Sequence, residues 1–415
     1  MENRKEKTHS AIFFTLLLSF LVAQPFTCLL NLPIAIALLL NWIVEGNWKA
    51  KWGAIDTVVK KLLFSSSILF FIIHIIGIFY SSDTAIAVSE IEYKIWFLVA
   101  PLVIFTVPPD RLNSKRLLLL AQGFILSSLA LILLNLSISA YEVSTHHSFY
   151  YFTYVWLSHF MHPSYSSMMI CTAFIISSQL FFNQQEKLSS MWRIICKIGM
   201  IVFPIYIFML QSKAGWLAFS LVFVLMGIYL INGNRKRYAW TAIFIALLIL
   251  LPTALFVVIP EPYNRMKPAV KHLLEKRNVD NPTDGTNQRL VVWKSACSVA
   301  RQHPLFGVGP GDVKEELTKE YAQRGYTHVS EKQFNTHNQY LQTLVGLGTV
   351  GLFILSCYLF IPLGYTIKYR RFASLLFFII VIINLFPESM LERKAGADFI
   401  GLGVALLTAF TGKTT

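Results

Sequence analysis

The sequence predicts an all-α, polytopic membrane protein with about 12 transmembrane helices and a small helical cap on its outer side. Of the 415 residues, 55% are hydrophobic and only 14% are charged, and the mean hydropathy is +0.56. Soluble domains carry about 25% charged residues. This composition excludes a soluble multidomain enzyme and a disordered or fibrous protein.

Apolar segments of roughly membrane-spanning length predict the individual helices. They lie near residues 11–23, 26–43, 62–80, 87–107, 117–137, 164–182, 195–210, 215–232, 239–259, 339–363, 373–389 and 398–411. No signal-peptide cleavage site follows the first segment, so we expect a retained helix that turns through Gln24–Pro25 into the second. The predicted domains are transmembrane helices 1–9 in residues 1–259, an outer helical cap in 260–338, and helices 10–12 in 339–415.

The positions of the basic residues predict the orientation. The net charge of +14 would be compatible with a nucleic-acid partner, but Lys and Arg lie in short clusters between the apolar segments, so none is expected. With the N-terminus in the cytoplasm, the inner loops contain the basic clusters near residues 49–61, 111–116, 187–197, 235–237 and 368–371. The outer loops at 81–86 and 138–163 contain no Lys or Arg. This distribution follows the positive-inside rule.

The polar segment 260–338 is too long for a simple connector. Helix signals within it predict helices over Arg265–Lys276, Asn287–Arg301 and Asp312–Arg324. An ordinary outer loop is the alternative interpretation. The aromatic and basic content of the segment favours a functional lid.

His337 lies in the polar stretch Asn335–Gln342, where the cap returns to the membrane. Thr336 is the predicted N-cap of the next helix, which places His337 in its first turn. The positive helix end disfavours an imidazolium there, and a neutral imidazole can accept a proton from a hydroxyl group. A helix-capping His is the alternative, but the polar neighbours Asn338 and Tyr340 favour function and are predicted to contact the substrate.

Two outer cations suggest an anion site. Arg289 opens the middle cap helix, and Lys213 occupies a short turn between two long apolar segments. Cations at this depth usually have a partner, and two of them beside a helix N-terminus suit a diphosphate. The alternatives are a solvated charge for Arg289 and snorkelling to lipid headgroups for Lys213. Trp293, on the same helix as Arg289, is a predicted substrate contact.

A histidine-rich segment contains His146, His147, His159 and His162. Because it lacks the i, i+4 histidine pair with a nearby carboxylate, we predict no metal site. Its interleaved aromatic residues suit an interfacial belt or a surface that stacks on sugars. His162 and Tyr165 are predicted substrate contacts.

Three further features bear on the chemistry. Glu90, Glu92 and Lys94 lie at the outer end of the fourth predicted helix and form either a local ion network or part of the same cleft, in which Lys94 would contact the substrate. The glycine-rich loop Phe306–Gly311 contains Pro310 and follows no strand, which argues against dinucleotide binding. No Asp-x-Asp pair occurs in the chain, which favours chemistry without a metal or other cofactor.

Several motifs together resemble the O-antigen ligase and polymerase superfamily of bacteria. They are Ser212–Trp216, Arg289–Trp293, Pro304–Gly311, His337–Gln342 and Gly346–Gly348. The predicted helix number and the single long outer loop are similar to the layout of that superfamily.

The resemblance implies a GT-C-type, metal-independent, inverting glycosyltransferase in the bacterial inner membrane with its active site facing the periplasm. The resemblance also implies two substrates, in contact with the membrane lipids. The donor is a glycan carried on undecaprenyl diphosphate, and the acceptor is the lipid A–core or another glycan. His337 matches the essential histidine of the superfamily, and Arg289 matches its loop arginine. Lys213 stands where the superfamily has a second arginine, so the charge is kept but the bidentate fork is lost.

Three functions remain open at this stage. A ligase would use the lipid A–core as acceptor, and a polymerase would use a second lipid-linked repeat with the same donor chemistry. A secondary transporter is the third possibility, but transporters place polar groups near the membrane midplane. Here the polar groups gather at the outer ends of the segments, which favours a transferase.

Overall fold

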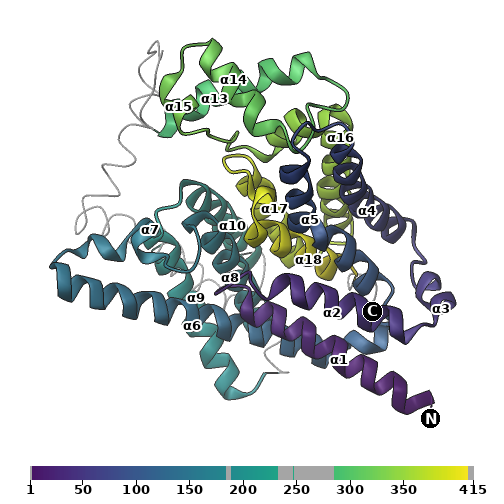
Figure 1. The fold of residues 1–415 in the computed structure, drawn as a ribbon. Coiled ribbons are helices and arrows are strands. Elements are labelled where there is room, and N and C mark those ends of the chain that lie inside the picture. Colours follow the sequence, from purple (N-terminus) through teal and green to yellow (C-terminus); the bar gives the residue numbers. More distant parts are fainter. Residues whose placement is uncertain (1, 184–187, 232–245, 247–284, 410–415) are drawn as a thin grey trace. The chain divides into compact units, whose positions relative to one another are not determined.

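The computed structural model describes residues 2–183, 188–231, 246 and 285–409. Within these residues every regular element is helical and no strand occurs. The chain divides into two compact units, a larger one of Met1–Gly123, Asn278–Phe378 and Leu385–Thr415, and a smaller one of Phe124–Arg277 and Ile379–Asn384. Figure 1 shows the helices of both.

The larger unit contains most of the helices. They are α1 (Glu2–Ala23), α2 (Asn31–Glu45), α3 (Trp48–Gly53), α4 (Val58–Ile78), α5 (Thr84–Phe105), η1 (Pro109–Leu112), α13 (Gly285–Gln302), α14 (Val313–Gln323), α15 (Thr327–Glu331), α16 (Gln339–Lys368), η5 (Met390–Glu392) and α18 (Lys394–Ala409). The smaller unit contains η2 (Phe149–Phe152), α7 (Tyr154–Leu157), α8 (Pro163–Asn183), α9 (Ser190–Met209) and α10 (Lys213–Ile231). Helices α6 (Ser114–His146) and α17 (Phe372–Leu385) have residues in both.

The helices confirm a polytopic, all-helical membrane protein. Each predicted apolar segment corresponds to a helix, apart from 239–259, of which the structure describes residue 246 only. The predicted cap helix Arg265–Lys276 lies outside the described residues. Among the described helices, 7 are long and apolar enough to cross a membrane. The full number of transmembrane helices, the membrane side of the cap and the domain boundaries stay predictions.

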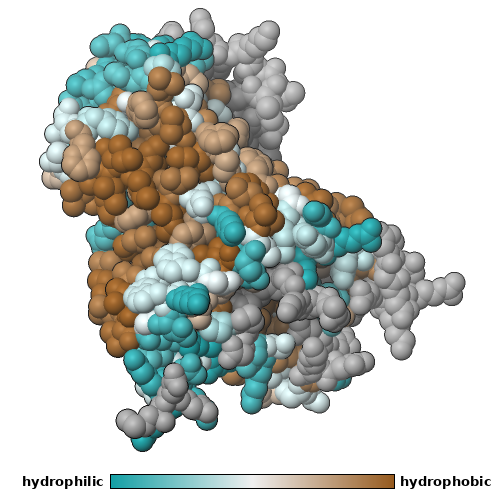
Figure 2. Space-filling model, turned by 90° about the vertical axis from the view of Figure 1, so that its right-hand side faces the viewer, coloured by the Kyte–Doolittle hydropathy of each residue, from teal (hydrophilic) through white to brown (hydrophobic). Residues whose placement is uncertain are grey.

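Apolar side chains line the outer surface of the membrane helices. Helix α4, for example, exposes Leu62, Leu69 and Ile76, each of them more than 40% accessible. The face shown in Figure 2 contains a broad apolar area, coloured brown. A lipid bilayer is the natural solvent for such a surface. Inside the larger unit, α5 packs against α2, α4 and α18. Trp96 of α5 contacts Phe20 of α1 with ring centroids 4.3 Å apart.

The described cap helices α13, α14 and α15 share a small hydrophobic core beside one end of α16 (Figure 1). Val292, Leu317 and Tyr321 are completely buried in it. Helices α13 and α14 confirm the predicted helices over Asn287–Arg301 and Asp312–Arg324 to within about two residues.

The loop between α13 and α14 pairs through its main chain with α16, at an interruption of that helix. Val308 N–H donates to Val345 O at 2.9 Å, and Gly309 N–H donates to Gly346 O at 3.0 Å. The interruption is at Gly348, where φ is 64°. These bonds give partners to polar main-chain groups that the break leaves outside the helical ladder.

Two glycines make this pairing possible. Gly348 and Gly307 both have positive φ, 64° and 72°, which side chains rarely tolerate. A Cβ atom at Gly348 would meet the carbonyl of Leu305, and one at Gly307 would meet the main chain of α16. Both belong to the glycine-rich motifs noted in the sequence. They serve close packing of two chain segments.

Candidate functional site

His337 lies immediately before α16 and not in its first turn. The helix begins at Gln339, and its N-cap is Asn338, whose side chain accepts a hydrogen bond from Leu341 N–H at 3.1 Å. The prediction that Thr336 is the N-cap is wrong. Thr336 is completely buried and donates from Oγ1 to the Asn338 carbonyl at 2.8 Å.

The main chain at His337 is held in the left-handed region, with φ of 45°. The side-chain oxygen of Asn335 accepts a hydrogen bond from His337 N–H at 3.1 Å. The Phe334 ring packs edge-on to the imidazole with ring centroids 5.7 Å apart. A non-glycine residue in this region costs about 1–2 kcal/mol and is often found at functional sites.

Glu388 brings His337 and Arg289 together. Its Oε1 lies 3.2 Å from His337 Nδ1, and its Oε2 lies 3.9 Å from Arg289 Nη2. The side chains of His337 and Arg289 are 31% and 29% exposed, and that of Glu388 is 13% exposed. We call these three residues the bridged cluster. With Nδ1 turned to a carboxylate, Nε2 is the nitrogen that can exchange a proton with a bound hydroxyl group.

The turn that carries Glu388 is set by its neighbours. Helix α17 ends at Leu385, and Pro387 follows, which cannot continue a helical hydrogen-bond ladder. On the other side of Glu388, Ser389 Oγ accepts a hydrogen bond from Asn338 N–H at 3.2 Å. The turn is thereby joined to the segment that carries His337.

Glu388 was missed in the sequence because it lies near the end of the predicted apolar segment 373–389. A carboxylate beside a proline at the end of such a segment was the available signal, since ionisable residues at membrane depth usually have a specific partner. The partner itself, 51 positions away along the chain, leaves no local pattern.

Helix α13 supplies two predicted site residues. Arg289 and Trp293 are four residues apart and so lie on the same side of the helix. The Trp293 indole N–H donates to the carbonyl of Thr336 at 2.9 Å, and its ring lies 5.3 Å from that of Phe386. Both side chains of α13 therefore face the segments that carry the rest of the bridged cluster.

Lys94 belongs to a buried ion network. Its ammonium group contacts Glu90 at 2.7 Å, the Leu391 carbonyl at 2.7 Å and Glu392 at 3.5 Å, and the side chain is completely buried. Gln339 donates to Glu392 at 3.0 Å. Burial opposes the ionisation of Glu392, but Lys94, Glu90 and Gln339 outweigh it, so the pKa of Glu392 lies below its usual value. A direct contact between Lys94 and a substrate stays a prediction.

The two predicted contacts at the start of α16 differ in their surroundings. Asn338 is 4% exposed and is used as the helix N-cap. Tyr340 is half-buried in the first turn. Contacts of either residue with a substrate stay predictions.

Lys213, His162 and Tyr165 belong to the smaller unit. Lys213 was predicted within the short turn, but it is the first residue of α10, directly after the turn that follows α9. The rings of His162 and Tyr165 lie 6.2 Å apart, and Tyr165 is 7% exposed. A place for these residues beside the bridged cluster stays a prediction. Within the residues that the structure describes, no group of three His, Cys, Asp or Glu side chains is arranged to hold a metal ion.

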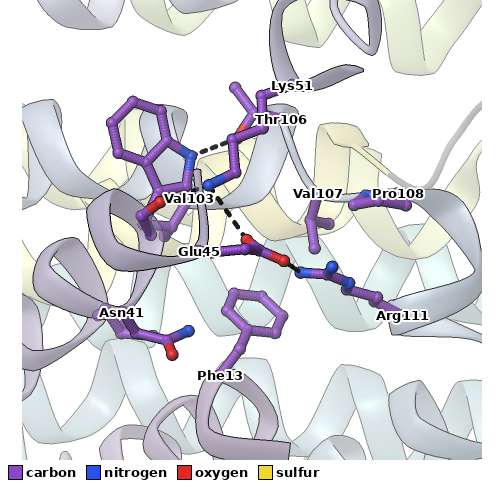
Figure 3. A pocket seen from close by; sticks show the side chains of 11 residues that line it. Phe13, Asn41, Glu45, Lys51, Val103, Thr106, Val107, Pro108 and Arg111 are labelled. Atoms are coloured by element: carbon purple, nitrogen blue, oxygen red, sulfur yellow. Dashed lines mark hydrogen bonds and ion pairs between the residues drawn. The ribbon is translucent and has the colours of Figure 1, made fainter. Parts of the chain in front are cut away.

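A separate pocket in the larger unit is lined by residues of α1, α2, α3, α5 and η1 (Figure 3). Its cavity measures about 10 Å³, which is room for about one water molecule. Glu45 pairs there with Arg111 and with Lys51, the latter at 3.1 Å. Trp42 donates to Thr106 at 2.8 Å. These groups satisfy one another, and the pocket is too small for a sugar or a diphosphate.

The helices and the bridged cluster together define a multi-pass membrane protein with a histidine, an arginine and a carboxylate gathered beside its cap helices. Residues 198–356 match the family described as O-Antigen ligase, an interval that contains Lys213, Arg289 and His337. This part of the chain is similar to the O-antigen ligase family.

One curated relative is an uncharacterized protein of Haemophilus influenzae, 25% identical over 165 residues. The similarity covers 38% of this chain and 39% of that protein. The chain thus matches about two fifths of that protein's length.

Proposed function

We propose that the chain is an O-antigen ligase of the bacterial inner membrane, acting at the periplasmic face. It transfers a glycan from undecaprenyl diphosphate to a sugar hydroxyl of the lipid A–core. The observation that supports this function is the bridged cluster, in which one carboxylate contacts a histidine and an arginine, in a chain whose residues 198–356 match the O-Antigen ligase family.

In the proposed reaction, His337 is the general base. The acceptor hydroxyl oxygen forms a bond to the anomeric carbon of the donor, and His337 Nε2 takes the hydroxyl proton. The bond between the anomeric carbon and the diphosphate oxygen breaks, and its electron pair leaves with undecaprenyl diphosphate. Attack from the face opposite the leaving group inverts the anomeric centre.

Arg289 and Lys213 hold the diphosphate and stabilise the charge that develops on it. A guanidinium binds phosphate oxygens in a bidentate manner, whereas an ammonium acts as a point charge. Cations placed at the leaving group supply electrostatic stabilisation without a divalent ion.

The test uses the purified full chain with a glycan on undecaprenyl diphosphate as donor and lipid A–core as acceptor. His337→Ala should lower the turnover by about 10²–10⁴-fold while donor binding survives, and activity should persist in EDTA. His303→Ala, which alters an exposed cap histidine, is the matched control. Near-normal turnover by His337→Ala would contradict the proposal.

The diphosphate role has its own variants. Arg289→Ala should weaken donor binding, whereas Arg301→Ala, an exposed arginine of the same helix, should not. Lys213→Arg should be tolerated because it restores the planar fork.

A polymerase that joins lipid-linked repeats is the alternative, because the family includes both activities. Deleting the gene distinguishes them. Unligated undecaprenyl-linked polymer would identify a ligase, and lipid A carrying a single repeat would identify a polymerase.

A further inference from the structure

The carboxylate of Glu388 contacts both other residues of the bridged cluster. One oxygen faces the imidazole of His337 at 3.2 Å, and the other faces the guanidinium of Arg289 at 3.9 Å. Under the proposed function, these partners perform different tasks, since one accepts a proton and the other binds the diphosphate. Glu388 therefore contacts both the proposed proton acceptor and the proposed diphosphate-binding residue.

The two contacts differ in strength. The separation from His337 is within hydrogen-bond range, and the separation from Arg289 is beyond it. Arg289 is also 29% exposed, and ion pairs of partly exposed groups are weak. The contact with Arg289 is thus the one that an incoming anion can replace.

A diphosphate is a stronger ligand for Arg289 than this carboxylate. It carries more negative charge and offers oxygens with the spacing that a guanidinium binds in a bidentate manner. Glu388 cannot follow Arg289 easily, because its turn is fixed between Pro387 and Ser389, whose Oγ accepts a hydrogen bond from Asn338 N–H.

We propose that Glu388 is a positioning residue that couples donor binding to the proton acceptor. In the unliganded protein it occupies Arg289 as a substitute anion. When the donor diphosphate takes Arg289, the carboxylate keeps its contact with His337, holds Nδ1, and stabilises the imidazolium formed as Nε2 takes the acceptor proton. This inference rests on the proposed function.

The proposal predicts opposite effects on binding and turnover for Glu388→Gln. Without the competing carboxylate, undecaprenyl diphosphate in detergent micelles should bind about two- to fivefold more tightly, the range of a partly exposed ion pair. The turnover should fall by at least about tenfold, because the charge opposite the imidazolium is gone. A merely structural role of Glu388 would weaken both quantities together.

Three further variants complete the experiment. Glu331→Gln, at an exposed position of α15, should change neither quantity. Glu388→Asp keeps the charge and should recover turnover relative to Glu388→Gln without the gain in affinity. In the Arg289→Ala background, Glu388→Gln should no longer tighten binding, because no guanidinium remains to be released.

Unchanged or weaker binding of undecaprenyl diphosphate to Glu388→Gln would overturn the proposal, and so would normal turnover. The proposed function fails separately, if His337→Ala retains turnover. Loss of turnover in His337→Ala together with unchanged binding in Glu388→Gln would keep the transferase and remove only the coupling.

Discussion

The indole of Trp293 is hydrogen-bonded to the carbonyl of Thr336, with 2.9 Å between the nitrogen and the oxygen. This bond connects cap helix α13 to the residue that directly precedes His337. The side chain that follows Arg289 by one helical turn therefore fixes the main chain that carries the imidazole.

Replacing Trp293 by Phe should separate this hydrogen bond from the packing of the ring. The buried Thr336 carbonyl loses a donor, which should lower the free energy of unfolding by about 1 kcal/mol. We expect a several-fold slower transfer, because the His337 segment is less well fixed. Thermal unfolding and transfer assays measure the two effects. The same change at Trp48, an exposed residue of α3, should leave transfer unaltered.

Gly348→Ala should disrupt the main-chain pairing between the α13–α14 loop and α16. The new methyl group would meet the carbonyl of Leu305, and φ of 64° adds about 1–2 kcal/mol of backbone strain. We expect a lower melting temperature and loss of transfer. Gly364→Ala, at an open position of the same helix, should be neutral or stabilise by up to about 1 kcal/mol. Equal melting temperatures for the two variants would contradict the proposed steric role of Gly348.

Lys94→Met should destabilise the protein strongly. It removes the buried cation between Glu90 and Glu392, and breaking a buried ion pair typically costs about 3–5 kcal/mol. Denaturant unfolding in detergent measures the loss. Adding Glu90→Gln to Lys94→Met should restore part of the lost stability, because one uncompensated charge is then removed. Lys319→Met, with a side chain that is 53% exposed, should unfold like the wild type.

The pairing at Glu45 predicts a pH dependence of stability. Burial opposes the ionisation of Glu45, but its hydrogen bonds with Arg111 and Lys51 and their charges outweigh burial and lower its pKa from 4.5. A carboxyl group with a lowered folded-state pKa stabilises the fold fully above its unfolded value, and this stabilisation is lost as the pH falls through the lowered pKa.

The measurement for Glu45 is the melting temperature between pH 7 and pH 3. Glu45→Gln should reduce the acid-induced drop, and Glu331→Gln should leave it unchanged. An identical acid dependence in wild type and Glu45→Gln would show that this carboxylate does not contribute.

The helices were predictable because each depends on a local apolar pattern. Helix α4 and the cap helix α13 both follow from their own residues, one from its apolar length and the other from a turn followed by periodic apolar positions. The ends were less predictable. Helix α17 ends at Leu385, four residues before the end of the predicted segment, because Pro387 interrupts it.

The site was predictable only one residue at a time. His337 and Arg289 stand out as polar groups beside apolar segments, but the carboxylate between them comes from a third segment of the chain. The start of α16 was misplaced for a similar reason. Thr336 has the right side chain for an N-cap, yet it is buried with its hydroxyl contacting Ser389 at 3.1 Å. Such contacts are decided by tertiary packing and have no periodic signal in the sequence.

The pairing between the α13–α14 loop and α16 depends on main-chain atoms, and its steric demand falls on glycines. Gly307 and Gly348 lie where the loop meets α16, and Gly309 and Gly311 lie against Ser81 and Asp83. The non-glycine side chains of the loop take no part in those hydrogen bonds. Divergent relatives can therefore change most of the letters in this region and still present the same geometry. A search for distant relatives should weight the spacing of these glycines relative to the histidine more heavily than overall identity.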